Sequence, residues 1–152
     1  MRYLVGAGTF AASDDGVGLR VVEGIAQAGQ DEARGVRAVS LPGGWADLPI
    51  VLGGDAERVL VVDCARMGLA PGDYRFFRAR DVESVKALRG VSTHGGDLLQ
   101  ALSLAEAVGQ PLPELEFMGI EPENVEPGIE LSPRVAARLD EYAAAALDHL
   151  TG

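Results

Sequence analysis

Four side chains that can bind metals or move protons follow predicted strands. Asp15 lies after the first apolar run, Asp63 ends the third, and His94 and Glu121 follow the fourth and fifth. In open parallel sheets, ligands bind beyond the carboxyl ends of the strands, because the connecting loops meet there. We therefore expect these four side chains to reach the same edge of the sheet.

Asp15, Asp63 and His94 together would suit a divalent transition metal. Two carboxylates and one imidazole are a plausible ligand set, and the imidazole disfavours calcium and magnesium. A carboxylate in such a site can also serve as a general base. Each residue has a simpler alternative. Asp15 can be a helix cap, Asp63 a solvated strand end and His94 a surface loop residue.

The turn Ser13-Asp14-Asp15-Gly16 joins the first predicted strand to the first predicted helix. Free N–H groups and the helix dipole favour a charged carboxylate at a helix start by a few tenths to about 1 kcal/mol. An Asp in this turn can therefore stay ionised as a ligand or base. The alternative is that Asp14 or Asp15 is only an N-cap, a common role for Asp before a helix.

Strand-like runs alternate with helix-like runs, which predicts an α/β fold with a mostly parallel sheet of five strands covered on both sides. The fourth strand is expected at or near an edge. A chain of 152 residues forms one domain, residues 1–152. The expected strands are 2–5, 36–41, 58–64, 73–80 and 115–120, and the expected helices are 18–28, part of 45–52, 97–108 and a last helix capped by Ser132 with Pro133 at its first position.

Composition excludes several functions. The net charge of −10 would repel phosphate backbones, so we expect no nucleic-acid partner. No stretch approaches the roughly 20 apolar residues of a membrane span, and the start does not resemble a signal peptide. We expect a cytoplasmic protein. With one cysteine, Cys64, an internal disulfide and a four-cysteine metal site are excluded.

Two other kinds of site are weaker. The run from Gly6 to Ala11 fits the dinucleotide pattern G-x-G-x-x-A. However, no helix starts inside it, and the acidic turn that follows would repel a pyrophosphate. Cys64 is a conceivable nucleophile, but a buried core thiol is the simpler interpretation.

The motifs, in order, resemble those of hydrogenase maturation endopeptidases, which trim the C-terminal extension of the large subunit of [NiFe] hydrogenases. The resemblance covers nearly the whole chain. It rests on G-A-G after the first strand, S-D-D-G-V-G-L-R-V-V-E, V-L-V-V-D, S-T-H-G-G, M-G-I-E-P-E and L-S-P.

The resemblance implies a three-layer α/β/α, phosphorylase/hydrolase-like fold and a cytoplasmic monomer acting on a large-subunit precursor. Asp15, Asp63 and His94 match the family positions that meet nickel, which would arrive with the substrate, so no resident cofactor is expected. Either Asp would be the catalytic base. Gly43 and Gly44 would let the substrate backbone approach closely, and Glu121 is a further substrate-binding candidate.

The sequence departs from the family pattern at two positions. Thr9 replaces the Asn of G-x-G-N, and Pro42 replaces the Asp of D-G-G-T. If that Asp orients the scissile peptide or a water, the chain would cut poorly or only bind. The alternative function is therefore a non-catalytic, chaperone-like homologue that docks on a metalloprotein precursor.

Overall fold

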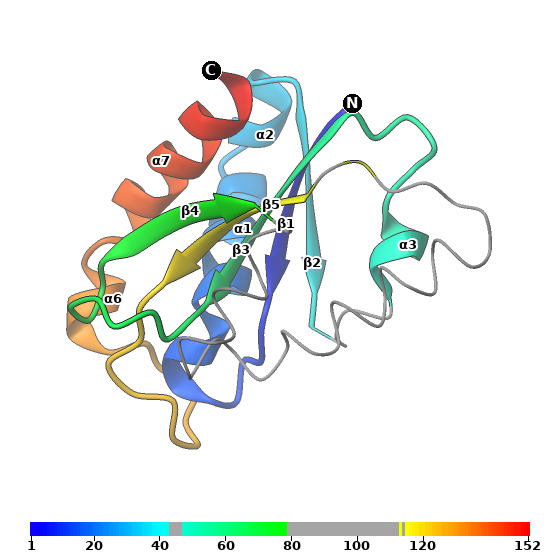
Figure 1. Ribbon diagram of the computed structural model, residues 1–152. Helices are drawn as coiled ribbons and strands as arrows, with labels where there is room; N and C mark the ends of the chain where they lie inside the picture. Colours follow the sequence, from blue (N-terminus) through cyan, green and yellow to red (C-terminus); the bar gives the residue numbers. More distant parts are fainter. Residues whose placement is uncertain (43–46, 79–112, 114) are drawn as a thin grey trace.

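The computed structural model describes residues 1–42, 47–78, 113 and 115–152 (Figure 1). Its centre is a five-stranded sheet in the order β2-β1-β3-β5-β4. The strands are β1 (Arg2–Ala7), β2 (Val36–Leu41), β3 (Arg58–Cys64), β4 (Tyr74–Arg78) and β5 (Leu115–Ile120). All five expected strands are therefore present, because short apolar runs rich in β-branched residues favour buried strands.

Four strands run parallel, and β4 lies antiparallel to β5 at one edge. The edge position of β4 confirms the prediction. The direction of β4 matters for the site. Its carboxyl end lies beside the amino end of β5, whereas β1, β3 and β5 all have their carboxyl ends on the other side of the sheet. The strand-end rule, which applies to parallel strands, therefore does not apply to β4.

The described helices are short except for two. A 3-10 turn, η1 (Ser13–Gly16), leads into α1 (Val17–Gln27), and α2 (Gln30–Ala33) follows. The chain ends in α6 (Pro133–Ala136) and α7 (Leu139–Thr151), so the predicted last helix is in fact two. Of the helix expected within 45–52, α3 (Leu48–Val51) is described. The helix expected at 97–108 lies outside the described residues.

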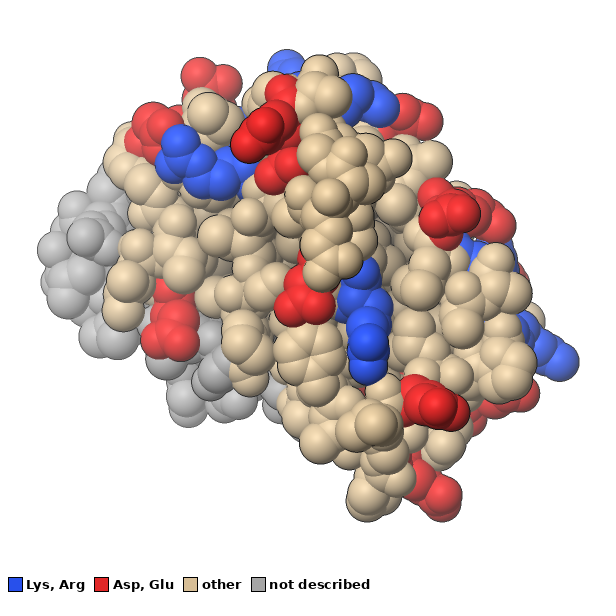
Figure 2. All heavy atoms as spheres, turned by 180° about the vertical axis from the view of Figure 1, so that it is seen from behind, with Lys and Arg blue, Asp and Glu red and all other residues tan. Residues whose placement is uncertain are grey.

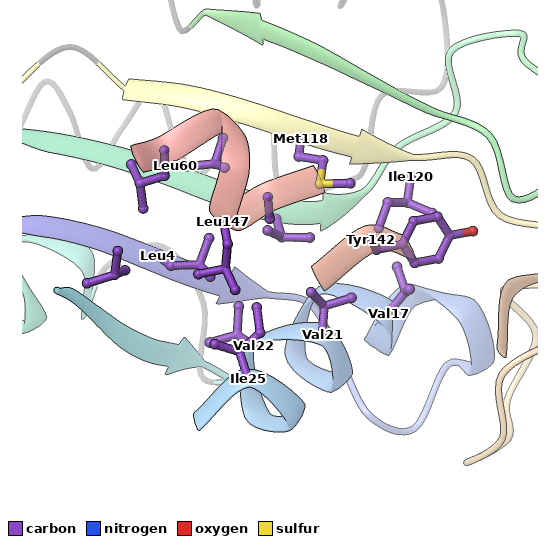
Figure 3. Packing of buried hydrophobic residues seen from close by; sticks show 14 of the residues in the cluster. Leu4, Val17, Val21, Val22, Ile25, Leu60, Met118, Ile120, Tyr142 and Leu147 are labelled. Carbon is purple, nitrogen blue, oxygen red and sulfur yellow. The ribbon is translucent and has the colours of Figure 1, made fainter. Parts of the chain in front are cut away.

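The sheet buries a hydrophobic cluster on each face. Because side chains alternate along a strand, Leu4 of β1 points to one face and Val5 to the other. The first face packs against α1 and α7, where Val22, Ile25 and Leu147 meet strand residues (Figure 3). The second face packs against Leu48 of α3. This layering agrees with the predicted α/β/α fold.

Two further features concern the molecular surface and the helices. Basic side chains lie beside acidic ones on the face shown in Figure 2, and they do not form a continuous basic tract there. None of the helices in the described ranges is both long enough and apolar enough to cross a membrane.

Candidate active site

Asp15 lies on η1, in the connection between β1 and α1. Gly8, with φ of +135°, packs on this turn so closely that a Cβ atom on it would lie 2.0 Å from the carbonyl oxygen of Asp15. Only glycine tolerates both that contact and that backbone angle. Of the two glycines that mimic a dinucleotide motif, Gly8 therefore serves close packing of the Asp15 turn, and Gly6 packs against Gly18 and Val22 of α1.

The start of α1 presses on the ends of β1 and β3. A Cβ atom on Gly18 would lie 2.1 Å from the carbonyl oxygen of Val62 and 2.7 Å from that of Ala7. Val62 directly precedes Asp63, and η1 also contacts β3. The fold thus brings the turn that carries Asp15 to the strand end that carries Asp63.

Asp63 is the penultimate residue of β3 and is paired with Gly119 of β5. The residue is 7% exposed. One carboxylate oxygen, Oδ1, accepts a hydrogen bond from the backbone N–H of Cys64 at 2.7 Å. The carboxylate is therefore held at the carboxyl edge and is not a freely solvated strand end.

The thiol of Cys64 lies within the field of several carboxylates. Burial raises the pKa of Cys64 well above its ordinary value, and the negative charges of Asp63, Asp15 and Asp14 raise it further. Arg66 acts weakly in the opposite direction. Two conclusions follow. Asp15 and Asp63 influence the same small region, and Cys64 stays a protonated core thiol, as the simpler interpretation expected.

Glu121, the residue after β5, is buried at the same edge. Its Oε1 atom accepts hydrogen bonds from the backbone N–H groups of Met67 at 2.7 Å and Leu69 at 3.0 Å. The backbone carbonyl of Glu121 accepts a hydrogen bond from the N–H of Gly72, and its backbone N–H donates one to the carbonyl of Asp73. Glu121 therefore organises the connection that leaves β3, and its role in binding substrate stays a prediction.

Asp14 faces inward and is fully buried. Its carboxylate accepts four hydrogen bonds from the segment after β5, whose donors are the N–H groups of Glu123, Asn124 and Ser132 and the hydroxyl of Ser132. Among the contacts described, neither Asp14 nor Ser132 makes a side-chain capping bond to its own helix. Ser132 occupies the predicted N-cap position of α6, with Pro133 first in the helix, but its hydroxyl is bound to Asp14 and makes no capping bond.

Three predicted site residues, His94, Gly43 and Gly44, lie outside the described residues. The carboxyl-end rule no longer brings His94 to the edge of Asp15, because β4 runs antiparallel. Within the described ranges, no group of three or more His, Cys, Asp or Glu side chains is arranged to hold a metal ion. The structure thus brings together Asp15, Asp63 and Glu121 at one edge, and the placement of His94 is still a prediction.

Sequence reasoning gave Asp14 no role beyond a possible N-cap, and it gave residues 123–131 no specific role. The doublet Asp14-Asp15 was a signal, but two identical residues do not reveal which of them faces inward. The segment after β5 is rich in proline and glycine, which indicates a loop. Its bonds to η1 depend on contacts more than 100 residues apart.

Residues 42–149 match the model of the family described as hydrogenase maturation protease. The match covers well over half of the chain. The chain belongs to the hydrogenase maturation protease family. It is therefore a peptidase, and the resemblance found in its motifs is confirmed.

Curated relatives agree with this assignment. The chain is 30% identical over 147 residues to a hydrogenase 2 maturation protease of Escherichia coli, covering 92% of this chain and 85% of the relative. It is also 30% identical over 149 residues to the hydrogenase expression/formation protein HoxM of Azotobacter vinelandii, covering 97% of this chain and 70% of HoxM.

Solved structures of maturation proteases share the fold. The [NiFe] hydrogenase maturation protease HybD of Thermococcus kodakarensis has a TM-score of 0.81 at 23% identity, with 98% of both chains covered. The maturating endopeptidase HybD of E. coli has a TM-score of 0.76 at 24% identity, covering 98% of this chain and 91% of HybD. The predicted α/β fold class is thereby confirmed.

Proposed function

We propose that this protease recognises nickel in the precursor of a [NiFe] hydrogenase large subunit and removes its C-terminal extension. The observation that supports this most directly is the convergence of Asp15 and Asp63. Asp15 comes from η1 and Asp63 from the end of β3, at one edge of the sheet, and both charges act on the thiol of Cys64. Such a pair offers oxygen ligands to a divalent ion in a chain of the maturation protease family.

Nickel enters this scheme as part of the substrate. Asp15, Asp63 and His94 contact it in the precursor, and the protease holds no metal of its own. An imidazole beside two carboxylates favours a transition metal over calcium or magnesium. Contact with nickel before cleavage makes the site a checkpoint for metal loading.

Hydrolysis needs a base and a means to polarise the scissile carbonyl. In the proposed reaction, Asp15 or Asp63 takes a proton from the attacking water, and the substrate's nickel stabilises the developing charge as a Lewis acid. The proton then passes to the leaving amine as the C–N bond breaks. Gly43 and Gly44 let the substrate backbone approach. The enzyme acts as a cytoplasmic monomer without membrane or nucleic-acid partners.

The decisive experiment compares cleavage of nickel-loaded and nickel-free precursor by the purified chain. The expected result is that only the loaded precursor loses its C-terminal extension, as seen by mass spectrometry of both products. Equal cleavage of both forms would overturn nickel recognition. Cleavage at an internal bond would overturn the assignment of the C-terminal extension as the target.

Three variants test the residues. Asp15→Asn and Asp63→Asn keep side-chain size but remove one ligand charge each, so each should lower the cleavage rate by about 100-fold or more. Asp148→Asn is the matched control, because Asp148 is exposed on α7 and pairs only with Arg34 among its described ion pairs. It should cleave at the rate of the unaltered protein.

A second candidate function, binding of the precursor without cleavage, is favoured by Pro42. This residue is exposed directly after β2, at the same edge as Asp15, where the family pattern has an Asp. If the unaltered chain binds the loaded precursor without cutting it, and Pro42→Asp cuts it, the chain is a docking homologue. Efficient cleavage by the unaltered chain removes this candidate.

A further inference from the structure

Asp14 holds the active-site turn to the segment after β5. Its Oδ2 atom accepts hydrogen bonds from the N–H groups of Glu123 at 2.9 Å and Asn124 at 3.0 Å, and from the hydroxyl of Ser132 at 2.8 Å. Its Oδ1 atom accepts the N–H of Ser132 at 2.7 Å. All four partners are donors, so only a residue that accepts at both oxygens satisfies them.

The backbone around Asp14 is bound to the same segment. Ser13 donates its N–H to the carbonyl of Gly128 at 2.9 Å and its hydroxyl to that of Glu126 at 2.7 Å. Asp14 donates its N–H to the carbonyl of Asn124 at 2.9 Å. Figure 1 shows residues 121–132 lying beside the turn of η1. The two segments therefore form one connected unit.

This unit fixes a turn that the sequence alone would not favour. Ser13 has φ of +53°, in the left-handed region that residues other than glycine seldom occupy. Asp15, two residues after Ser13, is held in addition by its close backbone contact with Gly8. Loss of the Asp14 bonds would free the turn to move and carry the Asp15 carboxylate away from Asp63.

We propose that Asp14 is a positioning residue that acts on cleavage through Asp15, by locking η1 to residues 123–132. This inference rests on the proposed function. Asp14 itself points into the protein and contacts no substrate. Misplacement of a catalytic group by about 1 Å can cost on the order of 100-fold in rate, so a lock of this kind is sufficient to control activity.

The test uses single-turnover cleavage of nickel-loaded precursor with enzyme in excess. Asp14→Asn should lower the rate about 10-fold to 100-fold. The NH₂ group of the new Asn would have to face one of the N–H or O–H donors that bind the Asp14 carboxylate, and two donors cannot bond to each other. In the Asp15→Asn background the same change should cost nothing further. A full additional loss in the double variant would overturn the inference, since Asp14 would then act independently of Asp15.

Variants of Ser132 give a graded second test if Asp14→Asn folds poorly. Ser132→Ala removes one of the four donors and should lower the rate by a smaller factor, whereas Ser132→Thr keeps the hydroxyl and should restore the rate. Leu150→Ala, in the core on the last turn of α7, controls for stability alone and should cleave normally below its unfolding temperature. A rate loss equal to that of Asp14→Asn in this control would overturn the inference.

Amide hydrogen exchange separates this inference from the proposed function, because it needs no substrate. Asp14→Asn should speed exchange of the Asp15 N–H, which bonds the carbonyl of Ala12 at 3.1 Å, while the amides of α7 stay protected. Unchanged exchange at Asp15 would overturn the inference. Failure of the unaltered chain to cut loaded precursor would instead overturn the proposed function, and the exchange result would still decide the structural lock.

Discussion

Gly18 of α1 lies so close to the carbonyl oxygen of Val62 in β3 that a Cβ atom at this position would be 2.1 Å from it. The contact joins the first turn of the helix to the residue before Asp63. It sets how far α1, and the turn of Asp15 that precedes it, can stand from the sheet. The distance between the two proposed catalytic carboxylates therefore depends on a position without a side chain.

Gly18→Ala should destabilise the protein by roughly 2–3 kcal/mol, because both oxygens that the new methyl group meets belong to strand backbones that cannot give way. Gly24→Ala is the matched control in the same helix. Nothing lies within 4 Å of its would-be Cβ, so Ala should stabilise the helix by up to about 1 kcal/mol. Urea unfolding of both variants measures the difference, and equal effects would contradict the close contact.

Cys64 should resist alkylation in the folded protein. Its pKa is raised by burial first and then by the nearby Asp charges, so little thiolate exists at pH 8. Iodoacetamide should label native Cys64 at least about 100-fold more slowly than the unfolded chain in guanidinium, where the pKa returns to about 8.5. Cys64→Ala should keep the cleavage rate. Rapid native labelling together with loss of cleavage in this variant would restore the thiol as a nucleophile.

Tyr142 should make the protein sensitive to alkaline pH. Its ring is fully buried and its hydroxyl donates to the carbonyl of Gly72. Burial, assisted by the charges of Glu141, Asp14 and Asp73 against that of Arg138, raises its pKa to about 12. The unfolded tyrosine titrates near 10. The stability contribution is thus complete below about pH 10 and is lost as the pH rises towards 12, because the unfolded state releases the proton first.

Tyr142→Phe tests this pH dependence. It should be about 1 kcal/mol less stable at neutral pH, because one buried hydrogen bond is lost. Above pH 10 its stability should fall less steeply than that of the unaltered protein. Urea midpoints measured between pH 8 and 11.5 give both slopes. Parallel curves would show that the tyrosine does not carry the alkaline response.

The sequence was sufficient to locate the strands and α1, because apolar runs and helical periodicity are local patterns. It could not show the direction of β4, since a strand alternates identically in both directions. The polar residues Gln30–Ala33 carry no buried face, so the short α2 left no pattern. The last helix was predicted as one, because α6 and α7 keep the same apolar spacing across the break at Arg138.

For the site, the strand-end rule placed Asp15 and Asp63 correctly at one edge, because that placement follows from parallel strands alone. The same rule does not extend to the residues after β4, since β4 is antiparallel, and the placement of His94 stays a prediction. The bonds of Asp14 and Glu121 could not be foreseen. They depend on backbone N–H groups of distant loops, which have no signature in residue type.

Glu121 offers a last prediction, because organising the loop after β3 requires only an acceptor oxygen, whereas binding the substrate through its charge requires a carboxylate. Its carboxylate accepts the N–H groups of Met67 and Leu69, so Glu121→Ala leaves two donors without this partner. That variant should lose roughly 2–4 kcal/mol of stability. Glu121→Gln keeps an acceptor oxygen and should lose only about 1 kcal/mol, the difference between a charged and a neutral acceptor. If Glu121 only organises the loop, the Gln variant should cleave with an unchanged KM. A raised KM in a Gln variant that loses no more than about 1 kcal/mol of stability would show instead that the charge of Glu121 contacts the substrate.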